Sequence, residues 1–184
     1  VARRDALWAA KAVAGPAPGR SAATPLPLFA QGLEGEGLRE PPARLPAMSL
    51  GEAVVEDYLS IRLSLRAHPV GLLRQRLLEE TAPPRCATAA EIAEAAAGRR
   101  VAMAGRVIVR QRPGSAKGVI FLTLEDETGQ ANIVVWQNIY QKFRRAVIAG
   151  RLVRVTGRIQ REGEGRHAVT HLVAERVEDR SDLL

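Results

Sequence analysis

The stretch that most constrains the fold of this chain is residues 105–136, which read GRVIVRQRPGSAKGVIFLTLEDETGQANIVVW. The run at 101–110, which overlaps its start, alternates between apolar and other side chains. Such period-two alternation predicts a half-buried strand with one apolar and one basic face. The apolar face is expected to carry Val101, Met103, Val107 and Val109, and the basic face Arg106 and Arg110.

Two further apolar runs, 119–124 and 131–136, predict the second and third strands of a meander. Between them the segment EDETG at 125–129 has the acidic, small and Gly residues of a tight hairpin turn. A metal site built from these three carboxylates is the alternative. Adjacent carboxylates on a strand point to opposite faces, so the hairpin turn is the favoured interpretation.

The chain after Trp136 predicts a helix at 137–149, ended by Gly150, and two more strands at 151–160 and 167–177. In the first of these, Val153, Val155 and Ile159 are expected to point inward, and Arg154, Thr156 and Arg158 outward. Three strands, a helix and two strands is the order of an OB-fold, a five-stranded Greek-key barrel. Gly105 fits a bulge in the first, sharply bent strand. An unrelated five-stranded barrel or sandwich is the alternative.

The chain before the barrel predicts helices and a linker, so the fold class is α+β, a helical connector followed by a five-stranded OB-fold β-barrel. Residues 1–14 are expected to be the end of a preceding helical region, and 15–48 form a linker that holds most of the eleven prolines. The helical connector spans 49–97, with capping boxes at Ser49 and Thr88 and a helix that begins at Pro69. The OB-fold domain is expected at 98–180.

The positive charge is confined to the barrel region. Residues 1–98 carry 11 basic and 11 acidic side chains, whereas residues 99–184 carry 16 basic and 9 acidic ones. A basic excess on one small domain is typical of a protein that binds a polyanion, nucleic acid first. A basic, solvated surface that binds nothing in particular is the alternative.

The remaining composition indicates a cytoplasmic protein that does not enter a membrane. No apolar run approaches the roughly 18–20 residues of a membrane span, and no secretory signal is evident at Val1. The single cysteine excludes an internal disulfide and a cysteine-based zinc site. The chain does not begin with Met, which suggests a fragment of a longer protein.

An OB-fold binds single strands on the face of its second and third strands and at two loops. The expected DNA-binding side chains lie at these places. They are Arg110, Arg112 and Lys117 at the first loop, Arg161, Arg166 and His167 at the second, and the rings of Phe121 and Trp136 on the strands. Phe121 could equally fill the core, whereas Trp136 ends its strand and is expected to be partly exposed.

No catalytic or metal-binding residues are predicted. The segment GSAKG at 114–118 lacks the spacing of a phosphate-binding loop and leads into a strand instead of a helix. The three histidines lack the ligand spacing of a zinc site. A free-standing enzyme is therefore the least favoured interpretation.

Long ordered motifs carry a family resemblance over nearly the whole chain. RQRPGSAKGVIFLTLEDETG, NIVVW and VTGRIQREG resemble the C-terminal OB domain of bacterial error-prone DNA polymerases, C-family paralogues of the DNA polymerase III alpha subunit. Upstream, DYLSIRLSLRAHPVGLLR is similar to the helical segment before that domain, and RRDALWAAKA to the end of a helix-hairpin-helix region.

The resemblance implies a DNA-directed DNA polymerase, a nucleotidyltransferase of damage-induced mutagenesis and lesion bypass. It implies single-stranded template DNA as a ligand, and a Y-family-like polymerase and a RecA-like accessory protein as partners. The catalytic carboxylates and Mg²⁺ of such enzymes lie in a palm domain that this chain does not contain, so the chain is expected to be inactive alone and to need no cofactor. The alternative is a protein-interaction module with little direct DNA binding.

The linker contains a candidate clamp-binding peptide at Leu26, Leu28 and Phe29. In the replicative relatives a sliding-clamp motif occupies a similar place, but the usual leading Gln is missing here. Packing of these apolar residues against a neighbouring domain is the alternative.

Overall fold

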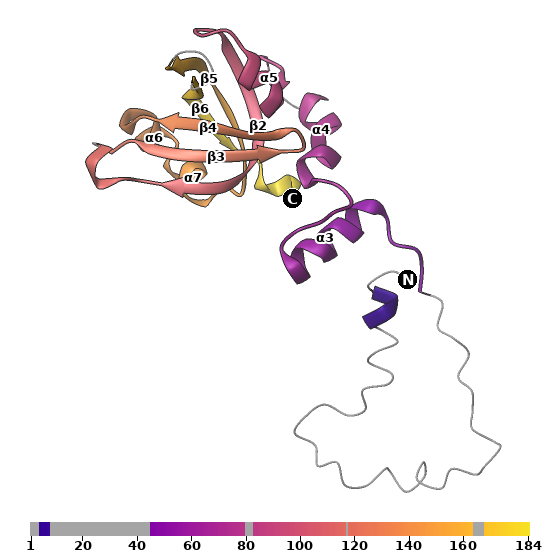
Figure 1. Cartoon of the computed structure of the whole chain (residues 1–184). Coiled ribbons are helices and arrows are strands. Elements are labelled where there is room, and N and C mark those ends of the chain that lie inside the picture. The colour runs from indigo at the N-terminus through magenta and orange to yellow at the C-terminus, as the bar shows by residue number, and fades with distance from the viewer. Residues whose placement is uncertain (1–3, 8–44, 80–82, 117, 164–167) are drawn as a thin grey trace, which may run out of the picture. The chain divides into compact units, whose positions relative to one another are not determined.

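The computed structural model describes residues 4–7, 45–79, 83–116, 118–163 and 168–184 (Figure 1). The chain forms two compact units, 1–47 and 48–184. In the first unit, residues 4–7 are helical. The clamp-binding candidates Leu26, Leu28 and Phe29 lie outside the described residues.

The second unit contains helices followed by a barrel. Its elements are α3 (Leu50–Ile61), α4 (Pro69–Glu79), β1 (Cys86–Ala87), α5 (Ala89–Glu94), β2 (Arg100–Gln111), a 3₁₀ turn (Gly114–Ala116), β3 (Ile120–Asp126), β4 (Gly129–Val135), α6 (Gln137–Lys142), α7 (Arg144–Ala149), β5 (Leu152–Glu162), β6 (Val169–Asp179) and a last 3₁₀ turn (Ser181–Leu183).

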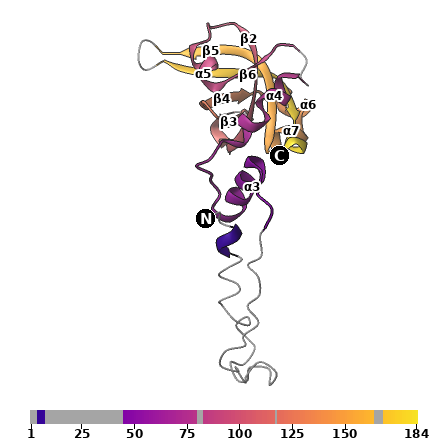
Figure 2. The same ribbon diagram turned by 90° about the vertical axis from the view of Figure 1, so that its right-hand side faces the viewer.

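Five strands close into a barrel, as the sequence predicts (Figures 1 and 2). Strand β2 pairs with both β3 and β5, so the order β2-β3-β4-β6-β5 returns to its start. All these pairs are antiparallel except β4 with β6. The short strand β1 was not predicted; it adds to β2 in parallel at Cys86–Ala87.

The barrel interior is filled by branched and long apolar side chains that alternate along the strands. Met103, Leu124, Ile133 and Val155 are fully buried there. Ile92 of α5 belongs to the same core. The predicted inward positions of β5 are confirmed, because Val153, Val155 and Ile159 are all buried.

The alternation predicted for β2 fails after Val107. The pairing of β2 with β3 shifts between Val107 and Val109, so Ile108 is an extra residue of a β-bulge. Val109 therefore lies opposite Thr123 and is 39% exposed. Arg110 lies opposite Leu122, a core residue, instead of on the outer face.

Gly157 marks a second bulge, between β5 and β6. A Cβ atom there would lie 2.0 Å from the carbonyl oxygen of Val173, a distance that no side chain tolerates. The pairing shifts between Thr156 and Gly157, so the backbones of the two strands approach each other here. Gly105 is crowded too, with Leu124 Cβ 2.9 Å from a built Cβ, but the bulge in β2 lies three residues later.

Two predicted helices are shorter than expected. The single helix expected at 137–149 is divided at Phe143, whose φ of −117° leaves the helical range, into α6 and α7. Its apolar side chains face the barrel, since Val147 is buried and Ile139 packs against the core. Helix α5 ends at Glu94, short of residue 97 where the helical connector was expected to end, because Ala95 is extended.

A second apolar cluster covers part of the barrel's outside. Val70 and Leu77 of α4 pack there with Ala104 of β2, Leu152 of β5 and the C-terminal Leu183. Two of the side chains predicted to point outward, Arg154 and Thr156, are buried.

The buried positive charge of Arg154 is balanced by a hydrogen-bonded ion pair. Its guanidinium donates to Glu178 at 2.6 Å and to the carbonyl oxygen of Pro84 at 3.0 Å. Burial alone would raise the pKa of Glu178, but the hydrogen bonds and charges of Arg154 and Arg176 together outweigh burial and hold this pKa below its ordinary value. The stabilisation is therefore present above the ordinary carboxyl pKa and is lost as the pH falls through the lowered one.

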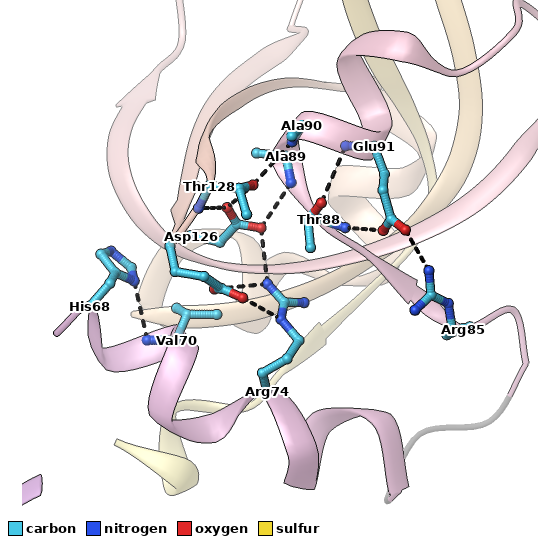
Figure 3. Close-up of polar contacts among 11 residues, drawn as sticks. His68, Val70, Arg74, Arg85, Thr88, Ala89, Ala90, Glu91, Asp126 and Thr128 are labelled. Atoms are coloured by element: carbon cyan, nitrogen blue, oxygen red, sulfur yellow. Dashed lines mark hydrogen bonds and ion pairs between the residues drawn. The ribbon is translucent and has the colours of Figure 1, made fainter.

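The hairpin turn between β3 and β4 joins the helices to the barrel (Figure 3). Asp126 is 3% exposed. Its Oδ1 accepts from the backbone N–H and hydroxyl of Thr128, and its Oδ2 accepts from the N–H of Ala89 at 2.8 Å and from Arg74 at 3.0 Å. The carboxylate of Asp126 thus links three parts of the chain by hydrogen bonds: its own turn, the first residue of α5 and Arg74 of α4.

Arg74 also bonds the next carboxylate of the turn. Its Nε donates to Glu127 at 2.7 Å. Burial alone would lower the pKa of Arg74, but Glu127 and Asp126 raise it above its ordinary value, so the guanidinium stays charged. Beside it, His68 Nε2 lies 3.4 Å from Glu125. The favoured turn interpretation of 125–129 is therefore confirmed.

Both predicted capping boxes are present. The side chains of Ser49 and Glu52 each accept from the other's backbone N–H, and Thr88 does the same with Glu91. The backbone bond from Thr88 is the main reason why the pKa of Glu91 lies below its ordinary value.

We expect Asp126→Ala to destabilise the chain by about 3–5 kcal/mol, because it leaves Arg74 and two backbone N–H groups without their buried acceptor. Urea unfolding monitored by circular dichroism measures this loss. Glu162→Ala is the control: this carboxylate is exposed and accepts a hydrogen bond from Gln160, so its loss should stay within about 0.5 kcal/mol. Equal effects for the two variants would contradict the role of Asp126.

Candidate nucleic-acid interface

The outer face of the barrel away from α4 carries two rows of side chains, one residue from each strand. Residues that pair across a sheet share a face, so the register defines each row. The first row is Gln111, Phe121, Val134, Val173 and Arg158; the second is Val109, Thr123, Asn132, His171 and Gln160.

Two aromatic rings stand on this face. Phe121 is 37% exposed and Trp136, which caps the start of α6, is 53% exposed. The structure therefore places Phe121 on the surface and not in the core, and the expected partial exposure of Trp136 is confirmed. Most large apolar residues of β3 and β4 point inward instead.

Both rings line one pocket of about 400 Å³. Its wall runs from the first loop across the four strands β3, β4, β6 and β5. The lining residues are Ser115, Val119, Phe121, Val134, Trp136, Gln160, Glu162 and His171. Aromatic rings that border an open pocket with polar groups opposite them offer the stacking surface on which unpaired bases bind.

Of the polar groups that line the pocket, some make hydrogen bonds within the described residues and one does not. Gln160 donates to Glu162 at 2.8 Å, which fixes both side chains at the end of β5. His171 Nδ1 is buried and makes no hydrogen bond to the described residues. The site therefore keeps hydrogen-bonding capacity beside its rings.

The predicted basic residues are not all gathered at these rings. Arg110 donates to the carbonyl oxygen of Gly150 at 2.8 Å. Arg161 donates to the carbonyl oxygen of Ala93 in α5 at 2.6 Å. Each of these guanidinium groups therefore already donates a hydrogen bond to a backbone carbonyl oxygen of the chain.

Arg112 is placed differently, because its guanidinium lies 5.4 Å from the ring centre of Tyr140 in α6. It remains exposed. The predicted residues Lys117, Arg166 and His167 lie outside the described residues.

Other arginines of the barrel are paired with carboxylates. Arg100 and Arg158 both bond Glu175, at 2.8 and 3.1 Å. The bond from Arg100 is the main cause that lowers the pKa of Glu175. The basic excess of this region is therefore partly neutralised around β6, whereas the predicted cations Arg110, Arg112 and Arg161 are all exposed.

The described residues do not fit the Mg²⁺ that the family resemblance associates with a polymerase. No three His, Cys, Asp or Glu side chains in the described ranges are grouped so as to hold a metal. The nearest candidate, the turn at 125–127, has its carboxylates bonded to Arg74, Ala89 and Thr128 or beside His68. Within the described ranges, none of the helices is both long and apolar enough to cross a lipid bilayer.

Several residues of this face were not singled out from the sequence. They come from three strands that meet through β6: Asn132 from β4, Gln160 and Glu162 from β5, and His171 from β6. The alternation of each strand indicates that they point outward. Which of them share a row depends on register, and register is not encoded locally.

A family model described as an OB-fold nucleic acid binding domain matches residues 101–179. These bounds enclose the closed barrel from β2 to β6. Among solved structures, asparaginyl-tRNA synthetase from Pyrococcus horikoshii overlaps with 53% of this chain and 23% of that chain, at a TM-score of 0.43 and 26% sequence identity.

The similar curated proteins are polymerases. The error-prone DNA polymerase of Ruegeria pomeroyi is 54% identical over 184 residues, which are 100% of this chain and 15% of the relative. That of Brucella abortus is 47% identical over 182 residues, 99% of this chain and 16% of the relative. Error-prone DNA polymerase 1 of Rhizobium meliloti is 46% identical over 183 residues, 99% of this chain and 15% of the relative.

This chain spans 15–16% of the length of these relatives, and its similarity to them runs through the helices as well as the barrel. The chain therefore belongs to the error-prone DNA polymerases, as a fragment of such a protein that contains an OB-fold domain.

Proposed function

We propose that this chain is an accessory region of an error-prone polymerase and that its barrel holds single-stranded template DNA. The observation that carries the proposal is the pair of exposed rings, Phe121 and Trp136, that border one pocket on the outer face. Removing the apolar surface of an exposed ring from water is favourable in free energy, so a ligand that covers such a ring gains affinity. Unpaired bases are flat, apolar ligands that stack on such rings.

The phosphates of the strand are held by the basic loops in this proposal. Arg112 and Lys117 belong to the first loop, and Arg166 and His167 to the second. No side-chain set resembles a code for reading base edges, so binding prefers single strands, ignores sequence and weakens with salt. Arg110 and Arg161 contribute less than their position suggests, because backbone carbonyl groups already engage them.

The parent protein, in this proposal, performs DNA-directed DNA synthesis in damage-induced mutagenesis and lesion bypass. Its palm carboxylates and Mg²⁺ lie outside this chain, and so does the nucleotidyl transfer. Its partners are the Y-family-like polymerase and the RecA-like protein of the mutagenesis machinery, with the sliding clamp as a further candidate through Leu26, Leu28 and Phe29. The protein works in the cytoplasm.

Removal of either ring tests the stacking. We expect Phe121→Ala and Trp136→Ala each to weaken binding of a labelled oligothymidylate by about 1–3 kcal/mol, since each loses a stacked base. Fluorescence anisotropy at fixed salt measures the affinity. Val169→Ala removes an apolar side chain that is 45% exposed and lies outside the ring pocket, so it should bind like the unchanged chain. The same affinity for all three variants would exclude stacking at this pocket.

A salt titration tests the loops independently of the rings. We expect Arg112→Ala with Lys117→Ala to reduce the magnitude of the log–log salt slope by about 0.7 for each phosphate contact removed. Lys142→Ala with Arg144→Ala removes the same charge from α6 and α7 and should leave the slope nearly unchanged. Equal losses for the two pairs would indicate diffuse electrostatics and no site at the loops.

A further inference from the structure

Exposed apolar side chains are concentrated before the barrel, around α3. Of the fifteen large hydrophobic residues that are exposed in the described part of the chain, seven lie between residues 50 and 72. They are Leu50, Val55, Leu59, Ile61, Leu63, Leu65 and Leu72. A soluble domain rarely exposes so many unless another surface covers them.

The opposite side of α3 is already occupied. Val54 and Asp57 are 2% and 7% exposed. Tyr58 lies under the guanidinium of Arg106 in β2, with 4.7 Å between the guanidinium carbon and the ring centre. The helix therefore has a buried side and a bare apolar side.

The segment after α3 is held by specific polar bonds. Arg62 ends the helix in the left-handed region, at φ 65°, and its N–H bonds the carbonyl oxygen of Tyr58. Ser64 Oγ donates to the buried carboxylate of Asp57 at 2.8 Å. Arg66 reaches the same carboxylate at 3.4 Å with its Nε and bonds Ser64 Oγ with its backbone N–H.

These bonds fix a turn whose leucines face outward. Leu59 is 71% exposed, Leu63 49% and Leu65 95%. We call these three residues the leucine turn. A non-glycine residue with positive φ and a buried carboxylate are costly features, and here they order a loop that covers none of the core. Side chains ordered in advance lose little entropy when they bind, which is how binding surfaces gain affinity.

We propose that the leucine turn docks into an apolar groove on the part of the polymerase that this chain does not include. The relatives carry 84–85% of their length outside the matched region, all in the same polypeptide. A tethered partner is present at high effective concentration, so a small apolar contact suffices. Arg66 is paired with Asp57 and Arg62 is exposed, so the turn is mainly apolar without being free of charge, and its three exposed leucines suit a groove on a protein.

This inference rests on the chain being part of a polymerase, but not on DNA binding by the barrel. Hydrogen exchange followed by mass spectrometry tests it on the 184-residue chain and on a full-length polymerase that contains it. We expect the amides of residues 59–66 to exchange at least about tenfold more slowly in the full-length protein. Leu63→Ser with Leu65→Ser should abolish that difference.

The matched control is Ile148→Ser with Val169→Ser, which removes two side chains exposed to 46% and 45% on the barrel. The control pair should leave the protection of residues 59–66 intact, and both pairs should leave the 184-residue chain folded. Leu65→Ala serves as a milder variant if the full-length double variant does not fold. Binding of oligothymidylate by the 184-residue chain should be the same with and without the leucine substitutions, which separates this inference from the proposed function.

Equal exchange of residues 59–66 in the two proteins would overturn the proposal. A dimer of the 184-residue chain in analytical ultracentrifugation, converted to a monomer by the leucine substitutions, would also overturn it. That result would assign the surface to a second copy of the chain.

Discussion

The buried carboxylate of Asp126 is the interaction on which the arrangement of this domain depends. It is the last residue of β3, next to the two-residue turn into β4, and its oxygens accept from that turn, from the first turn of α5 and from Arg74 of α4. A charge removed from water is costly unless every lone pair finds a donor, and here backbone and guanidinium supply them. The helices before the barrel are therefore fastened to the same hairpin whose strands carry the candidate DNA face.

Because α4 lies against only part of the barrel, the barrel has one covered and one uncovered outer face. On one, α4 packs against Ala104 of β2 and Leu152 of β5, and Arg154 and Thr156 of β5 are buried. On the other, β3, β4 and β6 are bare, and their rows present Phe121, Asn132 and His171. On the covered face, the buried Arg154 is paired with Glu178. On the bare face, the rings of Phe121 and Trp136 are exposed, and His171 Nδ1 makes no hydrogen bond to the described residues. A nucleic acid ligand is therefore proposed on the bare face.

Local patterns predicted the barrel and the helix starts, because strand alternation and capping boxes are encoded within a few residues. Ser49, Thr88 and Pro69 begin helices as expected. The errors came from long-range contacts. Arg154 looks like a solvent residue in its strand, but it is buried where it bonds Glu178 and the carbonyl oxygen of Pro84, which lies 70 residues earlier in the chain. The bulge at Ile108, which turns Val109 outward, depends on pairing with β3.

The candidate site was partly predictable for the same reason. The positions of Phe121 and Trp136 on the second and third barrel strands follow from the sequence, but the pocket that joins them to Gln160 and His171 depends on the pairing of β6 with β4 and β5. Photo-crosslinking of the 184-residue chain to a 5-iodouracil oligonucleotide, followed by mass spectrometry, tests whether single-stranded DNA binds at this pocket. We expect crosslinks at Phe121 and Trp136. Crosslinks confined to α3 and α4, with none on β3 or at the start of α6, would contradict binding at this pocket.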